Sequence, residues 1–412
     1  MNPREALTTA FRAAIQAGHP TRVLRDVPLP EVEGRTVIIS IGKAALSMAS
    51  TVQQRLGGRA TGVVVARQEE LPAHVENLTV LGSTHPAPSE ASSRAGQLVL
   101  QTVQGLTPSD LVLCLISGGA SSLVSAPTGV TLDEKARLTW ELLACGASIH
   151  EINTVRKHLS AIKGGGLARA AYPARVLALV VSDVVGDDVS TIASGPTAPD
   201  PTTFRDALAV LDHYGIRAPS VRAQLVRGVI KVQPETPKPG DPIFDHVEHR
   251  VIAGAATALS AAADCLQQHG WQARIWQENV TGPAIEAAKA HAAQATFLHS
   301  RQALLSGGET TTIIRPGGGR GGRNLEFLLS LALEAPDVYA IAADTDGIDG
   351  SSSAAGAILT PDTLERAAAL GLDPRTYLER SDAHRFFAAL DDLVETGPTG
   401  TNVNDFRCML RQ

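Results

Sequence analysis

The chain has 412 residues, 44% of them hydrophobic, so it is too long for one ordinary domain and can bury two or three cores. Its net charge of −6 and its 4% aromatic content argue against a nucleic-acid-binding protein, which needs a basic surface and base-stacking side chains. The four cysteines lie far apart with no CxxC pair, which argues against a disulfide framework or a structural zinc site.

The same composition argues against a membrane or secreted protein. The first twenty residues carry charges and do not resemble a secretory signal. No apolar run reaches the ~18 residues that a transmembrane helix needs. We therefore expect a cytoplasmic protein that acts on small molecules, without nucleic-acid or membrane partners, and for which a homodimer is one conceivable state.

The first strand-to-helix turn of the chain carries a lysine. A helix is predicted over 4–17, and a buried strand over Thr36–Ile41 ends at Gly42-Lys43. A lysine at such a turn can contact a phosphate, although the segment is not a Walker A loop and an ordinary surface lysine would look the same. Two further short strands precede His85, which is either a substrate contact or a hydrogen-bonded loop residue.

Two similar glycine-rich segments follow apolar strands in different halves of the chain. The run Leu111–Ile116 opens onto Ser117-Gly118-Gly119-Ala120-Ser121, and the run 303–305 opens onto Ser306-Gly307-Gly308-Glu309. Such turns let backbone N–H groups approach an anion, although glycine can also merely make a turn tight. The pair predicts two α/β units that face one site.

A helix predicted over 151–160 presents polar and basic side chains on one face. Asn153, Arg156 and Lys157 lie three and four residues apart, so they should project together. A solvated charged face is the alternative, but it does not explain Lys163, which stands beside three glycines.

The next buried strand, 175–181, delivers Asp183, Asp187 and Asp188 within six positions. Carboxylates at a strand end suit a general base or a metal site, while helix capping could account for one of the three.

The proline-rich segment 231–245 is the clearest linker, and it places the domain boundary between residues 1–238 and 239–412. Strand and helix patterns alternate on both sides, which predicts two α/β domains with largely parallel sheets. Ligands of such folds lie at the carboxyl ends of strands, where all of these motifs fall.

The segment 303–350 combines several features of phosphate chemistry. A glycine-rich loop ends in Gly322-Arg323-Asn324 and opens a helix, and the following strand delivers Asp344, Asp346 and Asp349. Glycines and a helix N-terminus suit an anion, the arginine adds a permanent charge, and the carboxylates can hold a metal.

The C-terminal tail holds Thr401, Asn402 and Asn404 among glycines. These are either turn residues or polar ligands that return to the active cleft, and the pattern alone leaves that choice open.

Taken together, these motifs resemble the glycerate 2-kinase family, whose C-terminal part is known as the MOFRL domain. The resemblance spans nearly the whole chain, in order, and is carried by 117–122 (SGGASS), 153–160 (NTVRKHLS), 163–165 (KGG), 182–188 (SDVVGDD), 194–197 (SGPT), 321–324 (GGRN), 345–350 (TDGIDG), 354–357 (AAGA) and 399–405 (TGTNVND). It implies ATP-dependent phosphorylation of D-glycerate to 2-phosphoglycerate with Mg²⁺. It also implies two α/β domains, the first Rossmann-like, with the site in the cleft between them.

The resemblance further implies that Lys43 and Arg323 are the catalytic cations. The chain departs from the family at Ala120, Gly166, Leu325 and 351–353, where glycine, arginine, glutamine and Pro-Thr-Asp are usual. These departures concern fine substrate and metal contacts rather than the reaction class.

The expected mechanism is positioning plus charge neutralisation. Mg²⁺ would be held by Asp183 or Asp187, or by the pair Asp346 and Asp349, and Asp187 would accept the C2 hydroxyl proton. The residues expected to bind substrate or nucleotide are Ser117, Gly118, Gly119, Ser121, Asn153, Arg156, Lys157, Ser306, Gly307, Gly308, Glu309, Gly322, Asn324, Thr401, Asn402 and Asn404.

The main alternative is an NAD(P)H-dependent hydroxypyruvate reductase, a name often attached to this family. Residues 317–322 formally satisfy GxGxxG between a strand and a helix, and Asp344 follows about twenty residues on. The loop is longer and looser than a dinucleotide-binding turn, and a reductase leaves the acidic residues after 175–181 unexplained. The pattern therefore favours the kinase, and so many cations and carboxylates also disfavour a non-catalytic nucleotide sensor.

Overall fold

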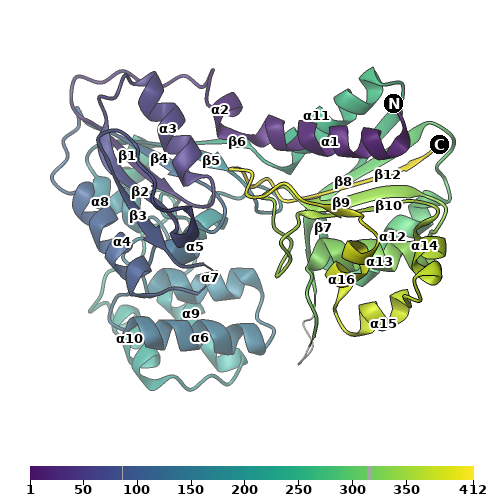
Figure 1. Ribbon diagram of the computed structural model, residues 1–412. Helices are drawn as coiled ribbons and strands as arrows, with labels where there is room; N and C mark the ends of the chain where they lie inside the picture. Colours follow the sequence, from purple (N-terminus) through teal and green to yellow (C-terminus); the bar gives the residue numbers. More distant parts are fainter. Residues whose placement is uncertain (86, 313–317) are drawn as a thin grey trace. The chain divides into compact units, whose positions relative to one another are not determined.

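The structure, a computed structural model, describes residues 1–85, 87–312 and 318–412 (Figure 1). The chain divides into two compact units. We call Leu24–Val181 with Asp187–Ile252 the N-terminal unit, and Met1–Val23 with Ser182–Gly186 and Ala253–Gln412 the C-terminal unit. Each described unit combines a six-stranded sheet with helices, which confirms the predicted class of two α/β domains.

The sheet of the N-terminal unit has the order β3-β2-β1-β4-β5-β6, which is the strand order of doubly wound dinucleotide-binding sheets. The neighbours β1 and β2, β2 and β3, β1 and β4, and β4 and β5 are parallel, consistent with the Rossmann-like expectation. The strands are β1 (Thr36–Ile41), β2 (Thr61–Arg67), β3 (Leu78–Ser83), β4 (Leu111–Ile116), β5 (Arg175–Val181) and β6 (Val247–Ala253). The strand order reverses between β1 and β4, so their carboxyl ends form the crevice where such sheets bind ligands.

Some helices of this unit form a bundle of their own. The helices of the unit are α3 (Ala45–Arg55), α4 (Glu90–Thr102), α5 (Ala120–Leu123), α6 (Leu132–Ala144), α7 (Ile149–His158), α8 (Gly166–Ala171), α9 (Phe204–His213) and α10 (Pro219–Val229), with short 3₁₀ turns at Gln68–Glu70, Ile192–Ser194 and Pro242–His246. Helices α6, α7, α9 and α10 gather into a bundle around Leu138, Leu142, Val155 and Phe204 (Figure 1). Capping boxes begin α6, α7 and α9, where Ser or Thr and an acidic residue exchange hydrogen bonds with the first turn.

The sheet of the C-terminal unit is mixed rather than largely parallel. Its order is β11-β10-β9-β12-β8-β7, with β7 parallel to β8 and the last strand, β12, antiparallel to both β8 and β9. The strands are β7 (Gln272–Pro283), β8 (Gln302–Thr311), β9 (Tyr339–Asp344), β10 (Gly356–Leu359), β11 (Leu393–Val394) and β12 (Asp405–Arg411). Alternation of strands and helices could not reveal that the chain terminus inserts between two earlier strands. As a result, Asp405 lies in register between Gly308 and Asp344.

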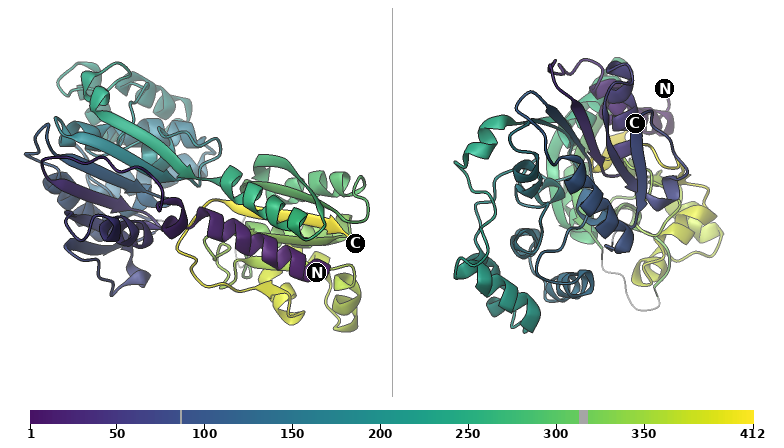
Figure 2. Two further views of the ribbon diagram at one scale, coloured as in Figure 1. Left: turned by 90° about the horizontal axis from the view of Figure 1, so that it is seen from above. Right: turned by 90° about the vertical axis from the view of Figure 1, so that its left-hand side faces the viewer.

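The helices of the C-terminal unit include the N-terminus of the chain. They are α1 (Pro3–Gly18), α2 (Pro20–Val23), α11 (Ala255–Gln268), α12 (Ala284–Ala295), α13 (Arg323–Glu334), α14 (Thr363–Ala369), α15 (Pro374–Glu379) and α16 (Ala383–Ala389). Figures 1 and 2 show α1 alongside α11. Its buried face includes Leu7 and Phe11, and the Phe11 ring centroid lies 5.6 Å from that of Phe406.

The units differ from the predicted division at residue 238 in three places. One is the short segment Ser182–Gly186, which groups with the C-terminal unit. Strand β6 follows the proline-rich segment yet joins β5 in the first sheet, so that segment does not end the N-terminal unit. Helix α1 belongs to the other unit, because its apolar face is buried there; burying one large side chain contributes about 1.5–3 kcal/mol. Within the described ranges, no helix is both long and apolar enough to cross a bilayer.

Candidate active site

Two glycine-containing turns meet at the carboxyl ends of β1 and β4. The Lys43 N–H donates to the Gly118 carbonyl (2.9 Å) and the Ala44 N–H to Ser117 Oγ (3.0 Å). Gly42 has φ 131°, and a Cβ there would lie 2.2 Å from Ser117 Oγ, so this close approach requires glycine. A Cβ on Gly119 would lie 3.1 Å from the His85 ring and 3.5 Å from Lys43 Cγ. The structure thus brings Lys43 and the 117–119 turn together, as predicted, and adds His85.

Next to this turn, Ser121 accepts hydrogen bonds from two buried or half-buried cations. Lys163 Nζ lies 2.8 Å from Ser121 Oγ and 2.7 Å from its carbonyl oxygen, while Arg156 Nη2 lies 2.8 Å and 3.2 Å from the same atoms. Ser194 Oγ joins the group, 2.8 Å from Ser121 Oγ and donating to Asn153 Oδ1 at 2.9 Å. Three predicted residues, Ser121, Asn153 and Arg156, therefore form one network.

A third cation, Lys135, interacts with Arg156 and Lys163 through its charge and was not predicted. It is only 4% exposed and donates to the Leu159 carbonyl at 3.0 Å. Burial, reinforced by the charge of Arg156, lowers the pKa of Lys135 to about 7. The sequence does hold a signal, because Lys135, Leu138 and Leu142 share the buried face of α6 at helical spacing. A lysine on the apolar stripe of an amphipathic helix marks a cation that the fold buries.

The three cations are close enough to repel one another. Burial lowers the pKa of Lys163 well below its ordinary value, and Arg156 and Lys135 lower it further. Burial lowers the pKa of Arg156 to about 10. Within the described part of the chain, none of the three makes an ion pair with a carboxylate. We call Lys135, Arg156 and Lys163 the cation cluster; such a group is suited to binding an anion.

Lys157 lies apart from the cation cluster, contrary to the predicted shared face with Arg156. Its Nζ pairs with Asp200 Oδ1 at 3.5 Å, and both side chains are buried. Asp200 also accepts hydrogen bonds from Thr202 and Thr236. Adjacent positions on a helix point about 100° apart, which is why Arg156 and Lys157 reach different partners.

The acidic turn after β5 is divided between the units. Asp188 caps the following turn, accepting from Ser190 and Thr191, which is the capping role foreseen for one of the three. Asp187 belongs to the N-terminal unit and has a left-handed backbone with φ 55°. Asp183 belongs to the C-terminal unit, where its Oδ2 accepts from Asn402 Nδ2 at 2.7 Å.

Arg323, the other predicted catalytic cation, is held by carboxylates. It begins α13, and its guanidinium lies 2.9 Å from each of Glu309, Asp344 and Asp405. Burial lowers the pKa of Arg323, but these three carboxylates outweigh it and raise that pKa above its ordinary value. Arg323 is therefore bound into the structure by ion pairs.

A second arginine supports this arrangement from behind. Arg407 is 1% exposed, pairs with Asp405 Oδ2 at 2.7 Å, and lies over the Phe327 ring at 5.1 Å. Asn324 Nδ2 also donates to Asp405, at 2.8 Å. Asp405 is thus fixed between two guanidinium groups, and we call Arg323, Glu309, Asp344, Asp405 and Arg407 the Arg323 cluster.

The described part of the glycine loop before α13 binds the protein's own carboxylates. Asp349 accepts from the N–H groups of Asn324 (3.0 Å) and Leu325 (2.9 Å), and Asp382 accepts from that of Arg320 (2.8 Å). A Cβ on Gly322 would lie 2.5 Å from Asp349 Cγ. Burial raises the pKa of Asp349 to about 6. These N–H groups were expected to face ATP phosphates, and Asp349 was expected to hold a metal. Instead, Asp349 caps α13 through the N–H groups of Asn324 and Leu325, and the Arg320 N–H binds Asp382. Position 317 of the predicted loop lies outside the described residues.

The Ser306-Gly307-Gly308 segment is not a turn like 117–119. It lies inside β8, where a Cβ on Gly308 would come 2.2 Å from the Val280 carbonyl oxygen of β7. Ser306 Oγ is buried 2.7 Å from His291 Nε2. The repeated SGG therefore reflects close packing between strands, and only Glu309, at the end of this segment, reaches the Arg323 cluster.

The C-terminal tail packs against the loop that follows β9. Thr345 Oγ1 donates to the Asn404 carbonyl (2.7 Å) and accepts from the Val403 N–H (2.9 Å), and the Thr399 N–H donates to the Asp346 carbonyl (3.2 Å). Thr401 serves packing, since its hydroxyl donates to the Gly18 carbonyl. The tail thus contacts both acidic loops, through Asn402 on the Asp183 carboxylate and through Thr399 on the Asp346 carbonyl. No group of three or more metal-ligating side chains occurs among the residues that the structure describes.

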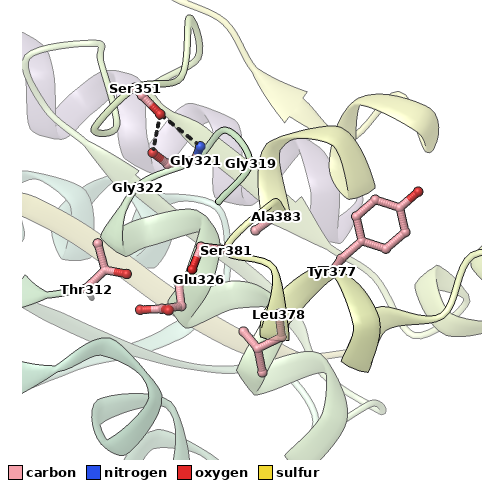
Figure 3. Close-up of a pocket in the computed structure, with 10 residues that line it drawn as sticks. All are labelled: Thr312, Gly319, Gly321, Gly322, Glu326, Ser351, Tyr377, Leu378, Ser381 and Ala383. Carbon is pink, nitrogen blue, oxygen red and sulfur yellow. Dashed lines mark hydrogen bonds between the residues drawn. The ribbon is translucent and has the colours of Figure 1, made fainter. Parts of the chain in front are cut away.

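A small pocket lies at the start of α13 (Figure 3). Its described lining includes glycine-loop residues, Glu326 of α13 and residues of α15 and α16. The lining residues are Thr312, Gly319, Gly321, Gly322, Glu326, Ser351, Tyr377, Leu378, Ser381 and Ala383. Ser351 Oγ bonds to both the N–H and the carbonyl of Gly321. The lining holds a carboxylate and no cation among these residues, so it does not suit a phosphate.

Two family models match successive parts of the chain. Residues 6–226 match the family described as "Domain of unknown function (DUF4147)", and residues 302–405 match the MOFRL family. A protein of Agrobacterium vitis, provisionally named hydroxypyruvate reductase, is 45% identical, and the match covers 100% of this chain and 95% of the relative. The D-glycerate 2-kinase of Thermotoga maritima is 38% identical over 96% of this chain and 95% of its own length. The crystal structure of a glycerate kinase from the same organism superposes with a TM-score of 0.88, at 36% identity over 99% of both chains.

Proposed function

This chain belongs to the DUF4147 and MOFRL family that includes the D-glycerate 2-kinase of Thermotoga maritima, and we propose that it phosphorylates D-glycerate. The C2 hydroxyl oxygen of glycerate attacks the γ-phosphorus of ATP, a new O–P bond forms, and the bond from that phosphorus to the β-phosphate oxygen breaks. The products are 2-phosphoglycerate and ADP, and the hydroxyl proton passes to a base.

The observation that supports this most is the near-complete overlap with relatives named as glycerate kinases, in sequence and in fold. The cation cluster supports it independently. Both substrates are anions, and phosphoryl transfer depends on positioning and neutralising negative charge. Two buried lysines and a half-buried arginine, without a carboxylate partner in the described chain, suit that task.

We assign the roles as follows. Lys43, beside the 117–119 turn at the β1–β4 crevice, stabilises the transferring phosphoryl group. Arg323 is the second cation and reaches a phosphoryl oxygen by exchanging Glu309, the exposed member among its carboxylate partners. Asp187, in the turn that follows β5 and in the same unit as Lys43, accepts the C2 hydroxyl proton.

Mg²⁺ would enter with ATP, because this ion is usually held by one or two carboxylates plus phosphate oxygens. Asp183 and Asp346 fit that pattern, since the tail joins their two loops in the C-terminal unit. Asp349 does not fit, because its oxygens accept backbone N–H groups. When bound, the ion would neutralise phosphate charge.

The structure gives no support to the reductase alternative. The described glycine-loop N–H groups bind Asp349 and Asp382, and Asp344, the acid expected on a ribose, pairs with Arg323. A dinucleotide would have to displace all three.

Two assays on one preparation test the proposal. With ATP, D-glycerate and Mg²⁺, we expect ADP and 2-phosphoglycerate, identified by enolase coupling, which does not accept 3-phosphoglycerate. With NADH and hydroxypyruvate we expect no oxidation of NADH. NADH turnover without ATP turnover would overturn the kinase proposal. A cytoplasmic location and a homodimer remain predictions, which cell fractionation and light scattering would check.

A further inference from the structure

The cation cluster points to one specific part of the acceptor substrate. We propose that Lys135, Arg156 and Lys163, with the Ser121 hydroxyl, form the subsite for the carboxylate of a small 2-hydroxy acid. The identity of that acid as glycerate rests on the proposed function, whereas the carboxylate subsite rests on the geometry.

Two cations of the cluster converge on Ser121, while the third, Lys135, donates to the Leu159 carbonyl and adds its charge. Lys163 Nζ and Arg156 Nη2 both lie 2.8 Å from Ser121 Oγ, and both also approach the Ser121 carbonyl. An ammonium has three N–H donors and a guanidinium five, which exceeds what one serine can accept. A neutral serine also balances none of their charge. A carboxylate beside Ser121 would accept the remaining donors and supply the counter-charge.

The neighbouring lysine shows that this lack of a counter-charge is specific to the cluster. Lys157 is buried like Lys135, but Asp200 lies 3.5 Å away and compensates it. Burying a cation without such a partner destabilises a fold, so a protein that retains two buried lysines and a half-buried arginine in this way gains something other than stability. Ligand binding is the common reason for such a trade-off.

The position of the cluster favours the carboxylate over the phosphates of ATP. The β1–β4 crevice, with Lys43 and the 117–119 turn, is the part of the sheet where phosphates usually bind. Ser121 follows that turn in the chain and is contacted by the half-buried Arg156 and by the buried Lys163. The planar guanidinium of Arg156 matches a carboxylate in a bidentate manner. A glycerate held here by its carboxylate could direct its C2 hydroxyl towards Lys43 and the transferring phosphoryl group.

The test compares Lys135→Met with Arg137→Met, which removes an exposed cation from the same helix. Thermal melting is followed alone and with D-glycerate, inorganic phosphate or a non-hydrolysable ATP analogue. We expect Lys135→Met to melt at a higher temperature than wild type without ligand, because it removes an unpaired buried charge. We also expect its affinity for D-glycerate to fall at least about tenfold, the effect of losing one charge interaction, with unchanged affinity for the analogue. Arg137→Met should behave as wild type.

Three results would overturn the subsite. The first is an unchanged affinity of Lys135→Met for glycerate. The second is a loss of affinity confined to the ATP analogue or phosphate. The third is a lower melting temperature with normal glycerate binding, which would mean that Lys135 is a structural residue. Should Lys135→Met fail to fold, Arg156→Lys gives the same answer through kinetics: KM for glycerate should rise at least about tenfold while KM for ATP stays constant. Equal changes in both KM values would contradict the proposal.

The same experiment separates this inference from the proposed function. Wild-type protein that binds D-glycerate through Lys135 but transfers no phosphoryl group would retain the subsite and refute the kinase. If the wild-type protein makes 2-phosphoglycerate but replacing Lys135 or Arg156 leaves the glycerate affinity unchanged, the kinase is retained and the subsite is refuted.

Discussion

The cation cluster and the Arg323 cluster are both built from basic residues at the functional ends of α/β sheets, yet they are electrostatic opposites. In the first, Lys163 and Arg156 donate to Ser121, Lys135 donates to the Leu159 carbonyl, and the described chain provides no carboxylate for the three. In the second, Arg323 contacts three carboxylates, and Arg407 contacts one of them again. The first has positive charge to offer an incoming anion, whereas the second has its positive charge already neutralised.

This difference shows that the partners of a basic residue, and not its presence in a motif, decide what it can bind. A cation without a counter-ion raises the affinity for an anion at some cost in stability. A cation among carboxylates contributes mainly to structure, and it acts on a substrate only if a partner gives way. Substitutions in the two clusters should therefore separate catalysis from stability.

The sharpest test on the anion-binding side is Lys43→Ala. Removing a cation that stabilises a transferring phosphoryl group can lower kcat by about 10³-fold. Because Lys43 is half-buried at a turn, we expect the free energy of unfolding to change by only about 0.5 kcal/mol. Glycerate-dependent ATP turnover and chemical denaturation measure the two quantities, with Lys231→Ala, an exposed lysine, as the control. Near-normal turnover in Lys43→Ala would remove Lys43 from the mechanism.

Arg323→Ala should behave in the opposite way, because its main effect should be a loss of folding stability. It leaves the buried Asp405 and Asp344 without their guanidinium, and breaking a buried pair costs about 3 kcal/mol or more. Arg323→Lys should recover only part of this loss, because one ammonium cannot span three carboxylates. Urea unfolding measures both variants. If Arg323→Ala unfolds at the wild-type midpoint, the ion pairs carry no stability and the contrast between the clusters fails.

Much of the fold could be predicted from sequence because it depends on local signals. Buried runs such as Leu111–Ile116 and the capping box that begins α7 are readable without knowing what surrounds them. Both depend on residues close together in the chain. Ser121, Asn153 and Arg156 were each predicted as binding residues, but the contacts that group them join positions 35 and 41 residues apart.

What could not be predicted depends on pairings between distant segments. The insertion of β12 between β8 and β9 brings Asp405 to Arg323, eighty-two residues away, and makes Arg323 the centre of several ion pairs. Asp349 and Asp382 occupy N–H groups of the glycine loop for the same reason. The motif GGRN is equally compatible with an internal carboxylate and an external phosphate, since both are anions that bind N–H groups.

The pH dependence of stability offers a milder test of the cation cluster. The pKa of Lys135 is about 7 in the folded protein against an ordinary 10.5, so between these values the unfolded chain binds more protons. Stability should therefore rise with pH across this window, by at most about 1.4 kcal/mol per pH unit from this one group. The charged groups that act on Lys135 are Arg156 of α7 and Lys163 of the following loop, and both are cations. Urea unfolding at about pH 7.5 and 8.5 should show a smaller rise in Lys135→Met than in wild type; equal slopes would mean that Lys135 titrates normally.

The smallest effect is expected from Ser121→Ala, which removes the hydroxyl shared by Arg156 and Lys163 but none of the charge of the cluster. Arg156 and Lys163 keep the Ser121 backbone carbonyl as an acceptor, so the free energy of unfolding should fall by only about 1 kcal/mol, the usual contribution of one hydrogen bond. The cations remain in place, so D-glycerate should still bind, with an affinity reduced by about tenfold or less. Ser194→Ala is the matched control, because it removes a hydroxyl from the same network without touching the cations. If Ser121→Ala abolished glycerate binding as completely as the loss of a cation, the hydroxyl and not the charge would define the site, and the contrast with the neutralised Arg323 cluster would lose its meaning.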